Sequence, residues 1–234
     1  MNVDIASDIT SSIESESKEL VDRLVDLDID QAEEIVDQIA SELLTGVAEE
    51  VVDKLPVVKW VGVGVQAYKS WQNKNLLEKL LMFHLSLDKT TPQQREEFLE
   101  SLAVDERRLI AKRLQLLIDQ LDDIKKARVL AKIFEARVIG EIDGHTYTML
   151  CYALKSLDYE SLAPIALFFV NGMSSTLLGL GMNYYLAALG ILLADNRMAG
   201  TLGAGSGIIF RKTHLGEKFA ELIVRAGVEP TAIR

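Results

Sequence analysis

A stretch of 33 residues without a charged side chain, from Leu162 to Ala194, constrains the fold more than any other feature of this sequence. Such a stretch has to leave water, either inside a protein core or in a bilayer. Its last part, residues 177–194, reaches the shortest length of a membrane-spanning helix. Pro164, several glycines, Asn183 and the lack of a flanking basic cluster instead favour a buried helix followed by a strand. Both interpretations stay open at the level of sequence.

The membrane interpretation has a second element in residues 57–67, which are apolar or glycine apart from Lys59 and Gln66. This run is too short to span a bilayer, but an interfacial position would put Trp60 at the level of the headgroups. A protein that hides residues 162–194 until triggered would be a membrane-inserting effector of the toxic or phage-defence type. The residues predicted to touch the membrane are Trp60, Leu178, Leu186 and Leu189.

The negative charge of the chain is concentrated at its N-terminal end. The formal charge is −10 for the whole chain, −13 for residues 1–54 and +3 for the rest. An acidic segment repels phosphate, which argues against nucleic-acid binding through this end. Leucine and isoleucine recur at helical spacing, so we predict an acidic amphipathic helical arm that buries one face on the body, a second copy or a partner protein. The partner-binding residues predicted on it are Leu20, Leu24, Ile35, Ile39 and Leu43.

Residues 55–158 are predicted to form a central antiparallel helical bundle. The pattern indicates helices over 75–87, 94–103, 105–121, 123–139 and 145–157. Thr91-Pro92-Gln93-Gln94 is a helix start signal, with a capping threonine, proline in the first turn and glutamine at the capping-box position. Because the turns between these helices are short, neighbouring helices are expected to run antiparallel.

The end of the chain combines a helix that turns at Gly190 into a strand, a glycine-rich loop, a second strand over 208–213 and a final helix over 215–223. The stretch from Phe210 to Phe219 is similar to the aromatic-x-x-Thr-x-x-Gly-x-x-Phe ending of many bacterial winged-helix proteins. The last fifty or so residues thus resemble the closing half of a winged-helix domain. The resemblance implies DNA contacts from Arg211, Lys212 and Lys218, but the helix expected to read DNA, residues 182–189, has neither arginine nor lysine.

No constellation of residues in the sequence points to catalysis, a metal or a cofactor. A single cysteine, Cys151, excludes an internal disulfide framework and a multi-cysteine zinc site. Aspartates at 26, 28 and 30 suit the start of a calcium loop, but the glycine and glutamate that such a loop requires further on are Gln31 and Asp37. The Gly-rich residues 200–207 lack the Lys-Ser/Thr pair of a phosphate loop. The histidines, which share no spacing, are His84, His145 and His214.

The sequence therefore predicts a mostly α fold with three parts: an acidic arm (1–54), a helical bundle (55–158) and an apolar segment with a winged-helix-like α+β unit (159–234). We expect a non-enzymatic protein of bacterial or phage type, without cofactor, that acts through protein–protein contact or self-association. The alternatives are the membrane-inserting effector and a winged-helix DNA-binding regulator. With no basic start or apolar core in its first twenty residues, the chain is expected in the cytoplasm, with membrane association as the alternative.

Overall fold

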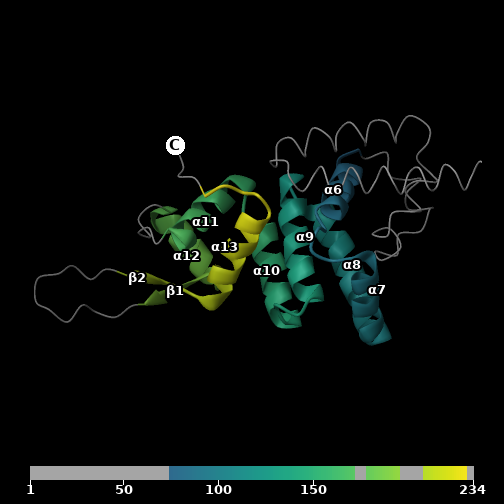
Figure 1. The fold of residues 1–234 in the computed structure, drawn as a ribbon. Helices are drawn as coiled ribbons and strands as arrows, with labels where there is room; N and C mark the ends of the chain where they lie inside the picture. The colour runs from purple at the N-terminus through teal and green to yellow at the C-terminus, as the bar shows by residue number, and fades with distance from the viewer. Residues whose placement is uncertain (1–73, 172–177, 196–207, 231–234) are drawn as a thin grey trace, which may run out of the picture. The chain divides into compact units, whose positions relative to one another are not determined.

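The computed structural model describes residues 74–171, 178–195 and 208–230, and this part of the chain is mostly helical with one small antiparallel sheet (Figure 1). The mostly α class is therefore confirmed, whereas the predicted acidic arm lies outside the described residues. The chain divides between Asp119 and Gln120 into two compact units. This division falls inside residues 55–158, the range that the sequence pattern assigns to a single bundle.

The described part of the first unit consists of three helices: α6 (Lys74–Leu85), α7 (Pro92–Ser101) and α8 (Val104–Gln120), which ends at the division. The predicted capping box at the start of α7 is confirmed. The Thr91 hydroxyl accepts a hydrogen bond from the Gln94 amide at 3.2 Å, and the Gln94 side chain accepts one from the Thr91 amide at 2.9 Å. Two of the amides left without helical partners at this end are thereby satisfied.

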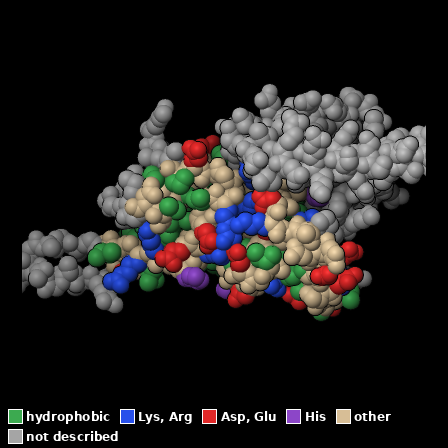
Figure 2. All heavy atoms as spheres, in the orientation of Figure 1, with side chains coloured by type: hydrophobic (Ala, Val, Ile, Leu, Met, Phe, Trp, Pro, Cys, Tyr) green, Lys and Arg blue, Asp and Glu red, His purple; other side chains and the backbone are tan. Residues whose placement is uncertain are grey.

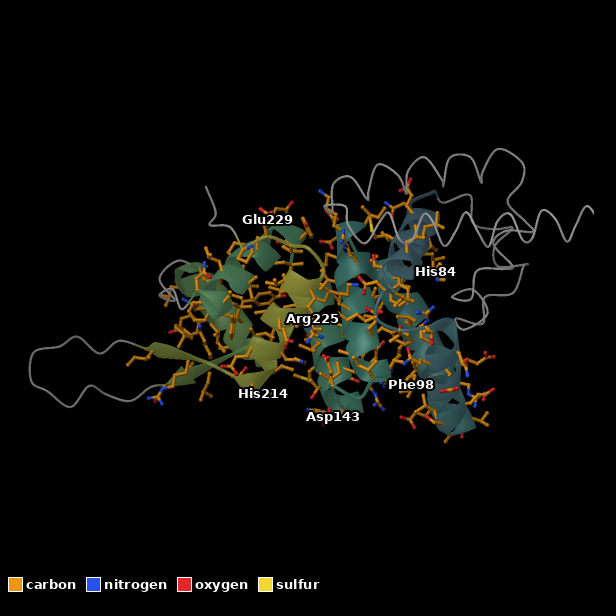
Figure 3. The ribbon with its side chains drawn as sticks, viewed as in Figure 1. His84, Phe98, Asp143, His214, Arg225 and Glu229 are labelled. Atoms are coloured by element: carbon orange, nitrogen blue, oxygen red, sulfur yellow. The ribbon has the colours of Figure 1, made fainter. Side chains whose placement is uncertain are left out.

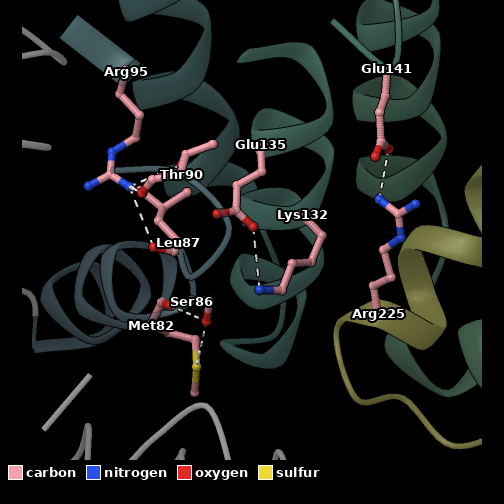
Figure 4. Close-up of polar contacts among 9 residues, drawn as sticks. All are labelled: Met82, Ser86, Leu87, Thr90, Arg95, Lys132, Glu135, Glu141 and Arg225. Carbon is pink, nitrogen blue, oxygen red and sulfur yellow. Dashed lines mark hydrogen bonds and ion pairs between the residues drawn. The ribbon is translucent and has the colours of Figure 1, made fainter. Parts of the chain in front are cut away.

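A buried arginine holds the turn between α6 and α7 (Figure 4). The Arg95 guanidinium donates to the Thr90 hydroxyl at 3.0 Å, to the Leu87 carbonyl at 3.4 Å and to the Thr90 carbonyl. Because these carbonyls follow the end of α6, a cation placed there is favourable. His84, also near the end of α6, is largely buried, and this burial together with the charge of Arg95 lowers its pKa from 6.5 to about 4.

The second unit is arranged around α9 (Lys125–Val138) and α13 (His214–Arg225). α9 packs against α10 (Gly144–Ser156) and against α13, and α13 also packs against α11 (Leu162–Val170). Every residue of α9 from Lys126 to Ala136 is buried, including an ion pair between Lys132 and Glu135 at 3.4 Å (Figure 4). The short 3₁₀ turn Tyr159–Ser161 leads into α11, and α12 (Gly179–Ala188) packs against the first strand.

A fully buried lysine closes the end of α10. The Lys126 ammonium donates to the Leu157 carbonyl at 2.6 Å and to the Asp122 carboxylate at 2.5 Å. Leu157 is the C-terminal cap residue of α10, where unpaired carbonyls give the helix end a partial negative charge. The contact satisfies one of these carbonyls and the buried ammonium at the same time.

A two-stranded antiparallel hairpin follows α12. β1 (Leu192–Asp195) pairs with β2 (Ile209–Lys212), with Leu193 opposite Arg211 and Ala194 opposite Phe210. The turn at Gly190 that the sequence predicts is confirmed, with φ at +75° and the Ile191 amide donating to the Leu186 carbonyl at 2.9 Å. One face of the hairpin carries the buried Leu192 and Phe210, and the other face is exposed.

The Thr-x-x-Gly pair that begins α13 closes the second unit. The Thr213 hydroxyl accepts from the Gly216 amide at 3.0 Å and lies 2.8 Å from the carbonyl oxygens of Gly190 and Ile191, to which it donates. Gly216 comes so close to the entry of β1 that a Cβ there would lie 2.3 Å from the Ile191 carbonyl oxygen and 2.4 Å from the Phe169 ring. α13, the start of β1 and α11 therefore meet at Gly216, where only glycine fits.

The uncharged stretch 162–194 is divided, among the residues described, between α11, α12 and β1. No helix in the described part of the chain combines the length and the apolar character that crossing a bilayer requires. Helix followed by strand, one of the two interpretations of this stretch, matches α12 and β1.

Candidate interaction surface

The outward face of α12 exposes large apolar side chains. Leu180 is 64% exposed and Tyr184, one helical turn further on, is 44% exposed. The opposite side of the helix carries Asn183 and Leu186, which are 3% and 0% exposed. Figure 2 shows hydrophobic side chains gathered over α11 and α12. We call the exposed or half-exposed residues on this side of the helix the α12 face; they are Leu180, Gly181, Tyr184, Ala187 and Ala188.

The α12 face is held in place from both sides. The Tyr184 ring meets the Phe210 ring of β2 edge-on, with 5.3 Å between centroids. The neighbouring Tyr185 donates its hydroxyl proton to the Ser156 carbonyl at the end of α10, at 2.6 Å. Two contacts on different elements fix the rotation of the helix, so the same side of α12 is presented outward.

The exposed side of the hairpin is also largely apolar. Leu193 and Ile209 are 58% and 54% exposed. Between them the Arg211 guanidinium pairs with the Asp195 carboxylate at 2.9 Å. This side of the hairpin therefore combines two free apolar side chains with a charge pair that is neutralised internally.

Lys212 is engaged within the second unit. Its ammonium donates to the Phe169 carbonyl at 2.8 Å and lies 5.0 Å from the centroid of the Phe168 ring. A cation over an aromatic face with a carbonyl partner is stabilised locally. The positive charge of Lys212 therefore stabilises the contact between the hairpin and α11.

Lys218 belongs to an ion-pair cluster that joins α13 to the turn after α9. Glu141 accepts from Arg225 at 2.7 Å and lies 3.2 Å from the Lys218 ammonium, which is 2.9 Å from Glu221. The hydrogen bond from Arg225 outweighs the effect of burial and lowers the pKa of the Glu141 carboxyl. In Figure 3, Arg225 lies at the end of α13, and His214 at its beginning.

Three of the residues that the sequence predicts for membrane contact are buried in the second unit. Leu178, Leu186 and Leu189 are buried, at the start, on the inner side and at the end of α12. Trp60 and the partner-binding residues predicted on the arm lie outside the described residues; the latter are Leu20, Leu24, Ile35, Ile39 and Leu43.

The histidines and the cysteine take no part in a common site. His145 and His214 are exposed at the starts of α10 and α13, where Asp143 and Thr213 are the capping residues. Cys151 is buried in α10, as its apolar neighbours predict. Among the described residues, no group of three or more histidine, cysteine or carboxylate side chains is arranged to hold a metal ion.

Leu180 and Tyr184 are not among the contact residues that the sequence predicts. Their spacing of four residues is the one available signal, but α12 has no charged residue to mark its outer side, so the exposed Leu180 cannot be told from the buried Leu186 by hydropathy. Comparison with known proteins adds no assignment: neither a protein family, nor a curated protein, nor a solved structure matches this chain.

Proposed function

We propose that this protein acts by binding protein, without catalysing a reaction, and that the α12 face is a contact surface. The observation that carries this proposal is the pair Leu180 and Tyr184, which leave large apolar area in water on a helix without charge. Large apolar side chains exposed together on one helix face are typical of surfaces that bind another protein. The arm stays a second predicted contact surface.

The order of elements in the second unit supports a winged-helix-like fold. The hairpin follows α10, α11 and α12, and α13 begins with the Thr-x-x-Gly pair of the resemblance. In such a fold α12 takes the position of the helix that reads DNA in the major groove. We infer that this position is used here for a protein surface, because base and phosphate contacts depend largely on arginine and lysine, which α12 does not have.

The DNA-binding regulator remains the second candidate, favoured by the element order alone. Its three predicted phosphate-contacting residues each have an intramolecular partner: Asp195 for Arg211, the Phe169 carbonyl for Lys212 and Glu141 for Lys218. Binding phosphate through them would compete with these contacts and with the net charge of −10.

The membrane-inserting effector draws less support. Insertion of α12 would expose Leu178, Leu186 and Leu189 to lipid only after the second unit had opened, because these side chains are buried in it.

A quantitative pull-down tests the proposed function. The tagged full chain is compared with a Leu180→Glu/Tyr184→Glu variant and with a Glu160→Lys variant, which changes an exposed residue on a different element. We expect a defined set of proteins, or untagged copies of the chain itself, to be retained by the wild type and by Glu160→Lys and lost from the double variant.

Equal recovery from all three baits would contradict the α12 face as a contact surface. A further variant of the full chain, Ile35→Asp/Ile39→Asp, assigns the contact to the arm if it alone loses the retained proteins. Circular dichroism of every variant, which reports retention of the helical fold, accompanies the comparison.

A further inference from the structure

Along the middle of the α12 face, the side chain before Tyr184 is larger than the one after it. Tyr184 lies at the middle of the face, with the large Leu180 one turn before it and the small Ala188 one turn after it. Gly181 and Ala187 flank the same stripe on its two sides. Around Gly181 there is open space, since a Cβ built there meets no atom within 4 Å.

From this arrangement we propose that the α12 face binds a second copy of itself, with the two α12 helices antiparallel about a two-fold axis at Tyr184. This inference rests on the proposed function and names the partner. An axis through Tyr184 sets Leu180 of one copy against Ala188 of the other, and Gly181 against Ala187. Leu180 then packs against the small Ala188, the small Gly181 and Ala187 let the helices approach, and the two Tyr184 side chains meet at the axis.

Charge distinguishes this face from the outer side of α13, another exposed helix surface of the second unit. A two-fold axis brings each residue near its own counterpart, so a charge close to the axis faces the same charge. α12 has no charged residue and meets no such penalty, whereas the outer side of α13 carries Glu217 and Glu221. A neutral, apolar surface is complementary to itself, and it gives no attraction to nucleic acid or to a strongly charged partner.

The area of the face sets the expected strength. A large aromatic or aliphatic side chain buries about 150–250 Å² at most, and the exposed parts of Leu180 and Tyr184 amount to roughly half of that each. With the neighbouring small residues the face supplies less than the ~800 Å² per partner of a standard interface. We therefore expect a weak dimer that forms where the local concentration of the chain is high.

Sedimentation velocity of the full chain over a wide concentration range tests this pairing. The wild type should pass from monomer to dimer. Leu180→Ala should weaken association by roughly tenfold or more, because the symmetry removes the same side chain twice. Ala188→Leu should weaken it as well, since two leucines then compete for one space. The double variant Leu180→Ala/Ala188→Leu should recover association, because the large–small pairing is restored in reverse.

Leu193→Ala, which shortens an equally exposed leucine on the hairpin, is the matched control and should associate like the wild type. A second measurement uses Tyr184→Cys: on a two-fold axis this cysteine meets its own copy, so mild oxidation should link two chains, and Leu193→Cys should give no such link. The native Cys151 is buried and adds no background.

A monomer at every concentration overturns the inference, as does a dimer that is unaffected by substitutions in α12. The first result leaves the proposed function standing if the pull-down still retains other proteins through Leu180 and Tyr184. The second assigns self-association to another surface such as the arm. The proposed function itself fails only if the wild type and all variants also recover the same proteins in the pull-down.

Discussion

At the residue scale, Gly216 is the described glycine at which an added side chain would have the least room. A methyl group added at Gly216 would lie 2.3 Å from the Ile191 carbonyl oxygen, and rotating a side chain cannot relieve this contact, because the oxygen belongs to the backbone. The Thr213 hydroxyl fixes the same backbone from the other side. The contacts of Thr213 and Gly216 explain why a threonine and a glycine suit the start of α13.

We therefore expect Gly216→Ala to lower the free energy of unfolding by about 3 kcal/mol or more, within the range for overpacking at a rigid site. The matched control is Gly181→Ala, which adds the same methyl in open space inside a helix and should be neutral or stabilising by up to ~1 kcal/mol. Urea unfolding followed by circular dichroism at low protein concentration measures both. Equal stability of the two variants would show that the approach at Gly216 is not tight in solution.

His84 gives the first unit a dependence on pH. Burial, and then the charge of Arg95, lower its pKa to about 4 in the folded chain, against 6.5 when exposed. Between these values the unfolded chain binds a proton that the folded chain does not, so stability falls as the pH is lowered from 6.5 towards 4. The full loss below pH 4 is on the order of 3 kcal/mol.

His84→Gln should flatten this part of the pH profile, because glutamine does not titrate. His145→Gln, at an exposed position in α10, should keep the wild-type slope. The measurement is the unfolding midpoint between pH 4.5 and 7. Parallel profiles for the wild type and His84→Gln would contradict the buried, neutral state of this histidine.

At the element scale, the sequence locates best those helix ends that are fixed by local chemistry. The capping box of α7 is predicted correctly, although the helix range predicted with it, 94–103, begins two residues late; Thr91, Pro92 and Gln94 act on their own backbone, and such local chemistry needs no knowledge of the rest of the fold. Gly190 marks the end of α12 for the same reason, since its positive φ is a local requirement. The outer side of α12 is set instead by Phe210 and Ser156, which are distant in sequence, so no pattern within the helix reveals it.

Another contact between distant elements is the cluster that joins α13 to the turn after α9. Glu141→Gln should destabilise the second unit by less than about 1 kcal/mol, because the carboxylate is partly exposed and its pairs with Arg225 and Lys218 are screened by water. The difference from the wild type should shrink as salt is added. It should also shrink as the pH falls below about 4.5, where the unfolded carboxyl takes up a proton, and disappear once the pH has passed through the lower pKa of the folded carboxyl.

Thermal unfolding at two salt concentrations measures this contribution. Glu160→Gln, at an exposed position outside the cluster, is the control and should have no effect beyond the experimental error. A loss for Glu141→Gln that does not change with salt would indicate that Glu141 acts through packing rather than charge.

At the scale of the whole molecule, the distribution of charge argues against DNA binding, whereas the position proposed for α12 favours it. A gain-of-function experiment can distinguish the two effects. The winged-helix-like arrangement proposed for the second unit would suit DNA binding, whereas the net charge of −10 and the uncharged α12 oppose contact with phosphate. We expect the wild type to show no salt-dependent binding to duplex DNA in fluorescence anisotropy. If α12 occupies the position of a DNA-reading helix, Leu180→Arg/Tyr184→Arg should create binding that falls steeply as salt rises, since each arginine adds a phosphate contact.

The same two arginines placed on α10 and at the end of α9, as Tyr152→Arg/Ile139→Arg, control for net charge alone and should bind far more weakly. Equal binding by the two double variants would mean that added charge, rather than the position of α12, attracts the DNA. Salt-dependent binding by the wild type itself would reverse the order of the two candidate functions, because the partners of Arg211, Lys212 and Lys218 would then have to give way to phosphate. The two double variants thus test whether α12 occupies the position that the proposed winged-helix-like arrangement gives it.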